Sequence, residues 1–236
     1  MPRAVILCPW RGKEPEREAA WKLIREYYSG FEIVTADTPG DFNLCGARNL
    51  AAKKAGDWDV ALFTLADVVV PVENISRAFD HALETGRITI PHDVCHMMTE
   101  AGHREGADAA VPIGNPELES RWKHACDSWQ NRHGPSGIEA FRRDTFEELG
   151  PWDERFITAL PEDASLLIKA GGFDRLSGPS YVFWHPVAWQ GAPREYGEPW
   201  PAYRSRYLDL KGRGEFRQNL VDENRTINDF GDWWWG

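Results

Sequence analysis

The chain contains 236 residues, of which 42% are hydrophobic and 27% charged, and its formal net charge is −10. This length and composition fit one soluble α/β domain with a substantial core. Contacts with phosphate dominate the binding of nucleic acid, so the negative charge argues against a broad basic binding surface and leaves room only for a local basic groove.

The cysteines and the apolar segments indicate the compartment. The four cysteines, at positions 8, 45, 95 and 126, have no CxxC spacing, which is typical of free thiols in a reducing cytoplasm. The amino-terminal apolar run stops at Pro9, and no later segment approaches the roughly 20 apolar residues of a membrane span. We therefore expect a soluble, cytoplasmic protein without a membrane span.

The beginning of the chain predicts a strand, a helix and a second strand. The continuous apolar run from Ala4 to Cys8 indicates a strand that is buried on both faces. Pro15 suits the first turn of a helix, whose apolar positions continue to about Tyr28 before Gly30 ends it. Phe31 to Thr35 predicts the second strand.

Two further helix and strand pairs follow. After a loop at residues 36–46, we expect a helix over Ala47 to Ala55 and a buried strand over Val60 to Leu65. Asn74 is a suitable cap for a third helix, and Arg87 to Ile90 predicts another strand. Strands that alternate with helices in this way predict parallel pairing through right-handed crossovers.

The second half of the chain has weaker patterns. Residues 91–115 show no clear period and predict a long loop that covers a site. Asp144 and Glu147 have the spacing of a capping box for a short helix that ends at Leu149. The other elements that we expect are a helix at 116–128, a strand at 138–142, a helix at 162–170 and a strand at 181–184.

Three polar residues follow predicted strands. Arg11 comes after the first strand, Asp37 after the second and Asp67 after the strand at 60–65. In open α/β sheets, ligands bind beyond the carboxyl ends of the strands. Asp67 is therefore a candidate metal ligand, and a turn-forming role for its carboxylate is the alternative.

An acidic pair and a later histidine also suit chemistry. Asp163, next to Glu162, is a candidate general base, and His185 is a candidate metal ligand. The alternative for the pair is favourable charge at the amino end of a helix. The alternative for His185 is a hydrogen-bonded position in the core.

The order and spacing of several segments resemble the inverting family 2 glycosyltransferases with the GT-A fold and their relatives with a galactosyltransferase-type carboxyl half. The resemblance implies an α/β, Rossmann-like, mostly parallel mixed sheet flanked by helices. It implies a GT-A domain at residues 1–187 and an aromatic-rich extension at 188–236 that packs on the domain or contacts the acceptor. The segments are VILCPWR, FEIVTAD, ARNL, LFTLADVVVP, SGIEAFRRDTFEELGPWDERF, PED and FWHP.

The resemblance also implies roles for individual residues. Asp67 matches the last Asp of the family's DxD, which binds a divalent metal, Mn²⁺ or Mg²⁺, on the donor diphosphate, and His185 matches a further metal contact. Asp163 matches the general base, which Glu162 would orient. The residues expected to bind the nucleotide-sugar donor are Arg11, Asp37, Arg48, Asn49, Ala66 and Asp67.

These roles imply metal-dependent transfer of a hexosyl or N-acetylhexosaminyl group from a nucleotide-sugar to an acceptor hydroxyl, with inversion. The metal would neutralise the charge that develops on the leaving nucleoside diphosphate, and the base would take the proton of the acceptor. Retention is the alternative stereochemistry. A saccharide, a protein or a modified base in DNA would each present a suitable hydroxyl.

Two segments depart from the family's pattern. Leu65 stands where the first Asp of the DxD is expected, so a catalytically silent module that binds nucleotide-sugar or glycan is an alternative. Ala159 to Pro161 replaces a Trp-Gly pair before the acidic residues, which leaves the sugar open. A nucleotidyltransferase is a further alternative, although residues 9–13 correspond only weakly to its glycine-rich triphosphate loop.

Two further clusters favour structural interpretations. The His, Asp and Cys residues between 92 and 103 match no usual zinc spacing, and an acceptor-facing loop is favoured there. The tail after Pro186 interleaves Arg with aromatic residues, which favours packing over the stacking of bases or sugars. Trp233 to Trp235 suits folding back on the body or a contact in a homo-oligomer.

Overall fold

The structure, a computed structural model, describes residues 2–40, 42–130, 137–152, 154, 170 and 172–186. The helices are α1 (Pro15–Tyr27), α2 (Leu44–Ala55), α3 (Val72–Thr85), α4 (Glu100–Arg104), α5 (Pro116–Ala125) and α6 (Arg143–Leu149). The strands are β1 (Ala4–Pro9), β2 (Glu32–Ala36), β3 (Val60–Phe63), β4 (Val68–Val69), β5 (Thr89–Ile90), β6 (Val94–Met98), β7 (Cys126–Gln130), β8 (Glu139–Arg142), β9 (Asp174–Arg175) and β10 (Pro179–Val182).

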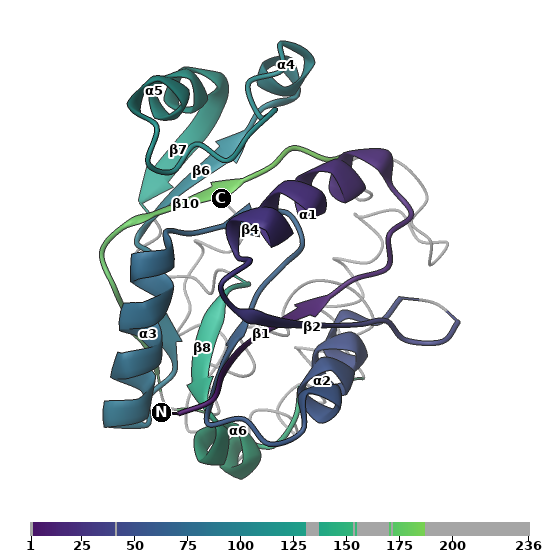
Figure 1. Ribbon diagram of the computed structural model, residues 1–236, viewed down its shortest axis with the longest axis vertical. Helices are drawn as coiled ribbons and strands as arrows, with labels where there is room; N and C mark the ends of the chain where they lie inside the picture. Colours follow the sequence, from purple (N-terminus) through teal and green to yellow (C-terminus); the bar gives the residue numbers. More distant parts are fainter. Residues whose placement is uncertain are drawn as a thin grey trace, which may run out of the picture.

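The strands form two sheets, one in the order β2-β1-β3-β8-β5-β9 and one in the order β4-β10-β6-β7 (Figure 1). Leu7 of β1 lies opposite Val34 of β2 and Phe63 of β3, and both pairings are parallel. The parallel strands predicted for the first part of the chain are therefore confirmed. The strand β8 pairs antiparallel with both β3 and β5, which makes the larger sheet mixed.

The core lies on both faces of the six-stranded sheet. Residues of β1 alternate between the faces, so that Ile6 and Cys8 pack with α1 and α3 in one apolar cluster. Val5 and Leu7 pack with α2 and α6 in the other. This two-sided burial explains why β1 has a continuous apolar sequence instead of an alternating one.

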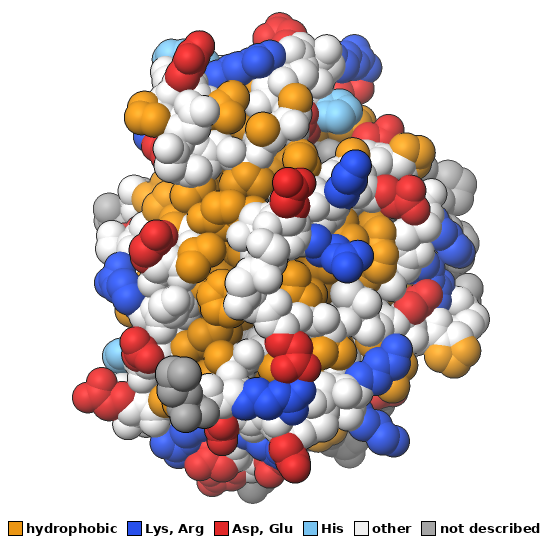
Figure 2. Space-filling view, in the orientation of Figure 1, with side chains coloured by type: hydrophobic (Ala, Val, Ile, Leu, Met, Phe, Trp, Pro, Cys, Tyr) orange, Lys and Arg blue, Asp and Glu red, His pale blue; other side chains and the backbone are white. Residues whose placement is uncertain are grey.

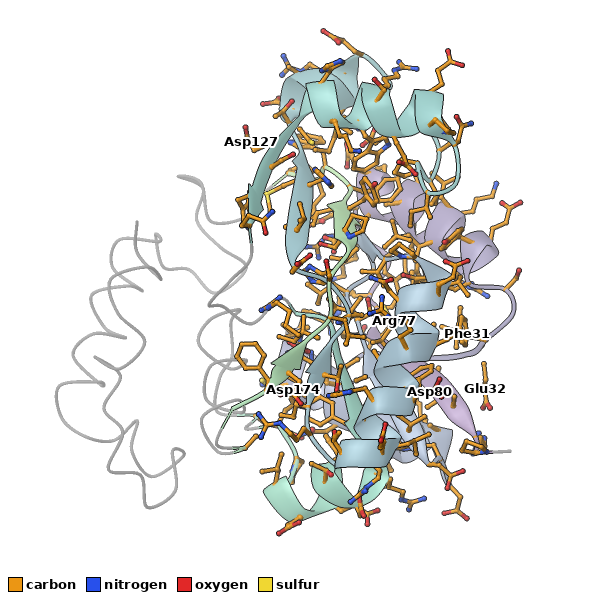
Figure 3. All side chains as sticks on the ribbon, turned by 90° about the vertical axis from the view of Figure 1, so that its left-hand side faces the viewer. Phe31, Glu32, Arg77, Asp80, Asp127 and Asp174 are labelled. Carbon is orange, nitrogen blue, oxygen red and sulfur yellow. The ribbon has the colours of Figure 1, made fainter. Side chains whose placement is uncertain are left out.

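The smaller sheet is tied to the body by Trp122 of α5, which is fully buried. Its ring lies 5.6 Å from that of Tyr181 in β10 and 5.0 Å from that of Phe183. Figure 3 shows this unit above the larger sheet, with Asp127 on β7 and Asp80 on α3. Hydrophobic side chains gather on the surface where the two parts meet (Figure 2).

The predicted strands lie within two residues of their expected bounds, but the start of α2 was predicted wrongly. The helix begins at Leu44 instead of Ala47. Its cap is Asn43, whose Oδ1 accepts a hydrogen bond from the backbone N–H of Gly46 at 2.8 Å. Turn-forming residues before the helix therefore serve as its cap and first turn.

The predicted capping roles of Asn74 and Asp144 are also wrong. The helix α3 begins before Asn74, which lies inside it and donates from Nδ2 to the carbonyl oxygen of Pro91 at 2.8 Å. No side chain caps α6. Asp144 instead accepts from the backbone N–H of its neighbour Thr145 at 2.7 Å. Local spacing predicted both caps, but the hydrogen bonds of the two side chains in the fold are different ones.

The predicted long loop at residues 91–115 contains β6 and α4, so that prediction is wrong. The strand β6 is held by β10 on one side and β7 on the other. Pairing with distant strands, which a local pattern does not contain, thus decides its structure. The helix α5 ends at Ala125 and β7 follows, where the sequence predicted helix to residue 128. Residues 162–169 of the helix predicted at 162–170 lie outside the described residues, as does the extension at 188–236.

None of the helices among the described residues has the length and apolar character that a bilayer span requires. All four cysteines are free, as predicted. Three of them are buried, whereas Cys126 in β7 is only partly buried.

The hydroxyl of Tyr28 holds the segment that follows Asp67. It accepts from the backbone N–H of Val70 at 2.8 Å and lies 3.2 Å from the carbonyl oxygen of the same residue, to which it donates. The whole side chain is buried, and this burial raises the pKa of Tyr28 well above its usual value. The interaction therefore connects the end of α1 to the chain just beyond β4.

We predict that Tyr28→Phe lowers the free energy of unfolding by about 1–3 kcal/mol, because it leaves the buried N–H of Val70 without its acceptor. Chemical denaturation measures the change. Tyr27→Phe is the matched control, since its hydroxyl only accepts a longer, 3.3 Å bond from Val72 in a partly buried position. Equal stability of the Tyr28→Phe variant and the wild type would contradict the prediction.

Candidate functional site

Asp67 lies between β3 and β4 and is 5% exposed. The antiparallel pairing of β4 with β10 sets Val68 opposite Val182. The pairing continues past the strand, because the backbone N–H of Phe183 donates to the carbonyl oxygen of Asp67 at 2.8 Å. This arrangement brings His185, which follows β10, next to the Asp67 side chain.

Three side chains meet at this point. His185 Nε2 lies 2.8 Å from Asp67 Oδ2. Arg17, from the first turn of α1, has its Nη2 3.1 Å from the same His185 nitrogen and 3.5 Å from the same Asp67 oxygen. The structure therefore brings the predicted metal contacts Asp67 and His185 together and adds an arginine between them.

The protonation of His185 follows from its second nitrogen. Nδ1 lies 2.9 Å from the carbonyl oxygen of Pro186, so this nitrogen carries a proton and donates it. Nε2 then either donates a second proton to Asp67 or accepts a hydrogen bond from Arg17. In both cases a positive charge lies against the buried carboxylate.

Electrostatics favour the charged forms of both groups. Burial alone would raise the pKa of Asp67, but the hydrogen bond from His185 and the charge of Arg17 outweigh it and leave that pKa below its usual value. Burial alone would lower the pKa of His185, but the hydrogen bond to Asp67 and its charge raise it. The site is thus built to hold positive charge next to Asp67.

Asp67 and His185 fit a divalent metal as two of its ligands. A carboxylate oxygen and an imidazole nitrogen suit an ion such as Mn²⁺, and the 2.8 Å between them lets both atoms face one cation. In the part of the chain that the structure describes, no group of three or more His, Cys, Asp or Glu side chains is arranged to hold a metal ion. Phosphate oxygens of a bound ligand would suit the remaining coordination positions.

Leu65, which stands where the resemblance predicts the first Asp of a DxD, has a packing role in the structure. Its side chain is partly buried and packs against the core cluster of α1 and α3. A Cβ built on Gly137, which has φ +69°, would lie only 3.0 Å from Leu65 Cδ1. The leucine thus fills a space against the backbone at the start of β8, where Gly137 leaves room for it.

Arg11 and Asp37 lie at the carboxyl ends of β1 and β2, as predicted, and they bind each other. Arg11 Nε is 2.8 Å from both carboxylate oxygens of Asp37. The guanidinium also donates to the carbonyl oxygen of Thr38 and lies over the ring of Phe42, 5.3 Å from its centroid. The Asp37 side chain is 39% exposed, so this ion pair faces the solvent beyond the sheet.

Arg48 and Asn49, predicted near the nucleotide-sugar, both contact the segment after α6. Arg48 is fully buried, with its guanidinium 4.0 Å from the centroid of a Trp152 ring. Asn49 Oδ1 accepts from the backbone N–H of Trp152, and its Nδ2 donates to the carbonyl oxygen of the same residue, both at 2.9 Å. Nδ2 also donates to Glu154 Oε1 at 2.9 Å.

The charges of Asp67, Arg48 and Arg17 all act on the buried thiol of Cys8 in β1. Burial raises the pKa of Cys8 well above its usual value, and the negative charge of Asp67 raises it further. Arg48 and Arg17 act in the opposite direction. Cations from α1 and α2 therefore lie within electrostatic range of the end of β1, close to Asp67.

Two predicted catalytic residues cannot be described. Glu162 and Asp163 lie outside the described residues, and their roles stay predictions. Ala66, predicted to contact the donor, is 8% exposed in the turn after β3.

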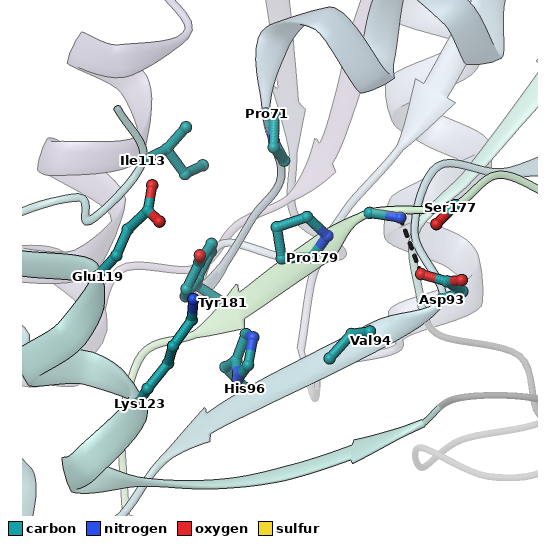
Figure 4. Close-up of a pocket in the computed structure, with 11 residues that line it drawn as sticks. Pro71, Asp93, Val94, His96, Ile113, Glu119, Lys123, Ser177, Pro179 and Tyr181 are labelled. Atoms are coloured by element: carbon teal, nitrogen blue, oxygen red, sulfur yellow. Dashed lines mark hydrogen bonds between the residues drawn. The ribbon is translucent and has the colours of Figure 1, made fainter. Parts of the chain in front are cut away.

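A separate pocket of about 270 Å³ lies between α5, β6 and β10 (Figure 4). The ring of His96 in this pocket stacks on Tyr181, with 5.1 Å between the centroids. Asp93 accepts from the backbone N–H of Gly178 at 2.8 Å, which closes one end. None of the predicted site residues that the structure describes lines this pocket.

The histidines of the zinc alternative lie in different environments. His96 Nδ1 is 2.6 Å from Ser128 Oγ on the neighbouring strand β7. His103 in α4 pairs with Asp108 at 2.9 Å and stacks on Trp184. His92 is 1% exposed, and this burial lowers its pKa to about 3. The predicted acceptor-facing loop is thus replaced by a strand and a helix with these local contacts.

Arg17 is the site residue that sequence reasoning did not identify. The helix dipole disfavours a cation in the first turn of a helix. The two neighbouring residues, Glu16 and Glu18, are acidic, as that position prefers. An arginine in an otherwise acidic first turn was the signal that the sequence offered.

No protein-family model and no curated protein matches the chain. A solved structure of GalNAc-T7 with UDP, GalNAc and Mn²⁺ aligns with a TM-score of 0.51 and 13% identity, over 98% of this chain and 53% of that one. The catalytic domain of Drosophila β1,4-galactosyltransferase 7 with xylobiose aligns with a TM-score of 0.44 and 14% identity, over 76% and 65%. A mannosyltransferase from Pyrobaculum calidifontis with GDP-Man and Mn²⁺ aligns with a TM-score of 0.47 and 12% identity, over 97% and 67%.

The chain has the GT-A fold, to which GalNAc-T7 aligns over nearly the whole chain, and this confirms the predicted fold class. It spans 53% of the length of GalNAc-T7 and 65% of the galactosyltransferase domain. At these low identities the likeness concerns the fold alone.

The contacts of Asn49 lead to a prediction about stability. Asn49→Ala removes the hydrogen bonds that hold Trp152, and we expect the free energy of unfolding to fall by about 1–3 kcal/mol. Lys53→Ala, on the exposed side of the same helix, is the control and should leave stability unchanged. Thermal or chemical denaturation measures both variants. An Asn49→Ala variant as stable as the control would contradict the structural role.

Proposed function

We propose that this protein is a metal-dependent glycosyltransferase that moves a hexosyl or N-acetylhexosaminyl group from a nucleotide-sugar to an acceptor hydroxyl, with inversion. The observation that carries the proposal is the meeting of Asp67 and His185 at 2.8 Å, beyond the end of β3 in a GT-A fold. A buried acid and an imidazole at this edge of the sheet suit a metal that binds a diphosphate.

In the proposed reaction, Asp67 and His185 would hold the metal, and the chemistry that such an ion would supply is neutralisation of charge on the departing nucleoside diphosphate. Arg11 orients the carboxylate of Asp37 toward the nucleotide, through the 2.8 Å contacts between them. Asp163 takes the proton of the acceptor hydroxyl as its oxygen bonds to the anomeric carbon. The electron pair of the broken sugar–phosphate bond leaves with the nucleoside diphosphate.

The direct test is a screen of UDP-, GDP- and dTDP-sugars with Mn²⁺, with thermal shift reporting binding and release of nucleoside diphosphate reporting reaction. Saccharides, a peptide and DNA that carries hydroxymethylated bases serve as acceptors. We expect one donor to stabilise the protein in the presence of Mn²⁺ and to be consumed with an acceptor. A chain that neither binds nor consumes any donor would contradict the proposal.

Asp67→Asn should abolish Mn²⁺-dependent binding of the donor. The loss should exceed the roughly 10- to 100-fold effect that is typical of removing an outer partner of a metal ligand, because the variant removes a ligand's charge itself. Calorimetric titration of the donor with and without Mn²⁺ measures the effect. Asp80→Asn, on the exposed surface of α3 (Figure 3), is the control. Unchanged Mn²⁺ dependence in Asp67→Asn would refute the metal role.

Asp163→Asn should leave donor binding nearly intact and lower transfer by at least the roughly hundredfold effect of losing a general base. Single-turnover transfer measures the chemical step, and donor titration measures binding. If transfer by this variant equals that of the wild type, the base lies elsewhere.

Leu65 favours one second candidate, a silent module of the same fold that binds nucleotide-sugar or glycan. A leucine that packs against the core stands where the resemblance predicts the first acid of a DxD, which supports a site with a weakened metal role. Binding of a donor without release of nucleoside diphosphate, with every acceptor tried, would support this function in place of transfer.

A further inference from the structure

We infer that Arg17 is a built-in cation that occupies the Asp67–His185 site in the absence of donor, so that a divalent metal enters only when a donor diphosphate draws Arg17 away. This inference rests on the proposed function for its second half, the role of the donor. Its first half, competition between Arg17 and a metal ion, rests on geometry alone. No pattern in the sequence predicted a role for Arg17.

The two side-chain atoms that face Arg17 are the same two that would bind a metal. Asp67 Oδ2 and His185 Nε2 are 2.8 Å apart, and Arg17 Nη2 lies 3.5 Å from the oxygen and 3.1 Å from the nitrogen. A metal ion needs the lone pairs of both atoms. The guanidinium and the metal therefore exclude each other at this position, by contact and by like charge.

The described part of the chain offers the metal few ligands besides these two. Leu65 removes the carboxylate that the DxD pattern would supply. Among the described side chains, no third acid, histidine or cysteine completes a metal group here. A cation that is already inside the protein therefore competes on favourable terms with a metal from solution.

The Arg17 side chain is able to move away from Asp67 and His185. It is 39% exposed, whereas that of Asp67 is 6% exposed. Its Nε lies 3.2 Å from a carboxylate oxygen of Glu14, three residues back along the chain, and these two atoms are buried although the side chains as a whole are partly exposed. Rotation about side-chain bonds moves Nη2 away from Asp67 without any change in the backbone of α1.

A diphosphate attracts the guanidinium of Arg17, whereas a metal ion repels it. Arginine binds phosphate oxygens through two parallel hydrogen bonds, and these are among the stronger charge-assisted contacts in proteins. A donor diphosphate beside Asp67 would thus bind Arg17 and supply the missing ligands of the metal at once. The donor and the metal then bind with positive coupling.

The test measures Mn²⁺ affinity without any nucleotide, by calorimetry or by the electron paramagnetic resonance signal of free Mn²⁺. Arg17→Gln removes the charge, and we expect it to bind Mn²⁺ at least about tenfold more tightly than the wild type, a change of about 1.4 kcal/mol. Arg25→Gln, an exposed position in the last turn of the same helix, should match the wild type. Arg17→Met is a second variant in case the glutamine variant folds poorly.

Two further measurements tie the effect to the site. Asp67→Asn combined with Arg17→Gln should lose the gained affinity, because the shared ligand is gone. UDP or GDP should raise the Mn²⁺ affinity of the wild type, and the increase should be smaller in Arg17→Gln. Affinity for Mn²⁺ in Arg17→Gln and Arg17→Met that equals or falls below that of the wild type would overturn the inference.

The outcomes separate this inference from the proposed function. Tighter Mn²⁺ binding in Arg17→Gln, with no donor bound by any form of the protein, would overturn the glycosyltransferase proposal and the coupling to donor, and would leave the competition standing. Donor turnover with unchanged Mn²⁺ affinity in the Arg17 variants would support the glycosyltransferase proposal and would overturn the competition between Arg17 and the metal.

Discussion

The buried carboxylate of Asp67 is the constraint on which the site depends. A carboxylate that is 5% exposed is stable only with opposite charge and hydrogen bonds close by. The fold meets this need from two directions, with His185 after β10 and Arg17 at the start of α1. The short pairing of β4 with β10 matters more than its length suggests, because it sets the distance between Asp67 and His185.

The rest of the fold keeps that pairing in register. Trp122 packs against Tyr181 and Phe183, and all three belong to the core cluster of β1 and α1, which fixes β10 on the body. The hydroxyl of Tyr28 hydrogen-bonds to the backbone N–H and the carbonyl oxygen of Val70, which follows β4 as Asp67 precedes it. A shift of one residue between β4 and β10 would turn Tyr181 and Phe183 to the other face of the sheet. The geometry of the cation site is therefore tied to the core.

The sequence predicts the parts of this fold that local patterns determine. The apolar runs of β1 and β3 mark strands buried on both faces, and Asp67 at the end of β3 was found from that position. By contrast, β6 and β7 depend on partners far along the chain, and the loop predicted over β6 shows that limit. The contact of Arg17 with His185 joins residues that no local pattern connects. The pairing of Asn49 with Trp152 is of the same kind.

The leucine in the DxD position is part of the packing of this protein. Leu65 fills the space that Gly137 leaves, at a backbone φ of +69° that other residues rarely adopt. An acid at position 65 would remove that packing and would add a second negative charge near the buried Asp67. With one acid, the charge of the cluster is balanced by Arg17 and His185 before any ligand binds. A site of this kind responds to an incoming anion, which recruits the arginine, more than to a metal ion alone.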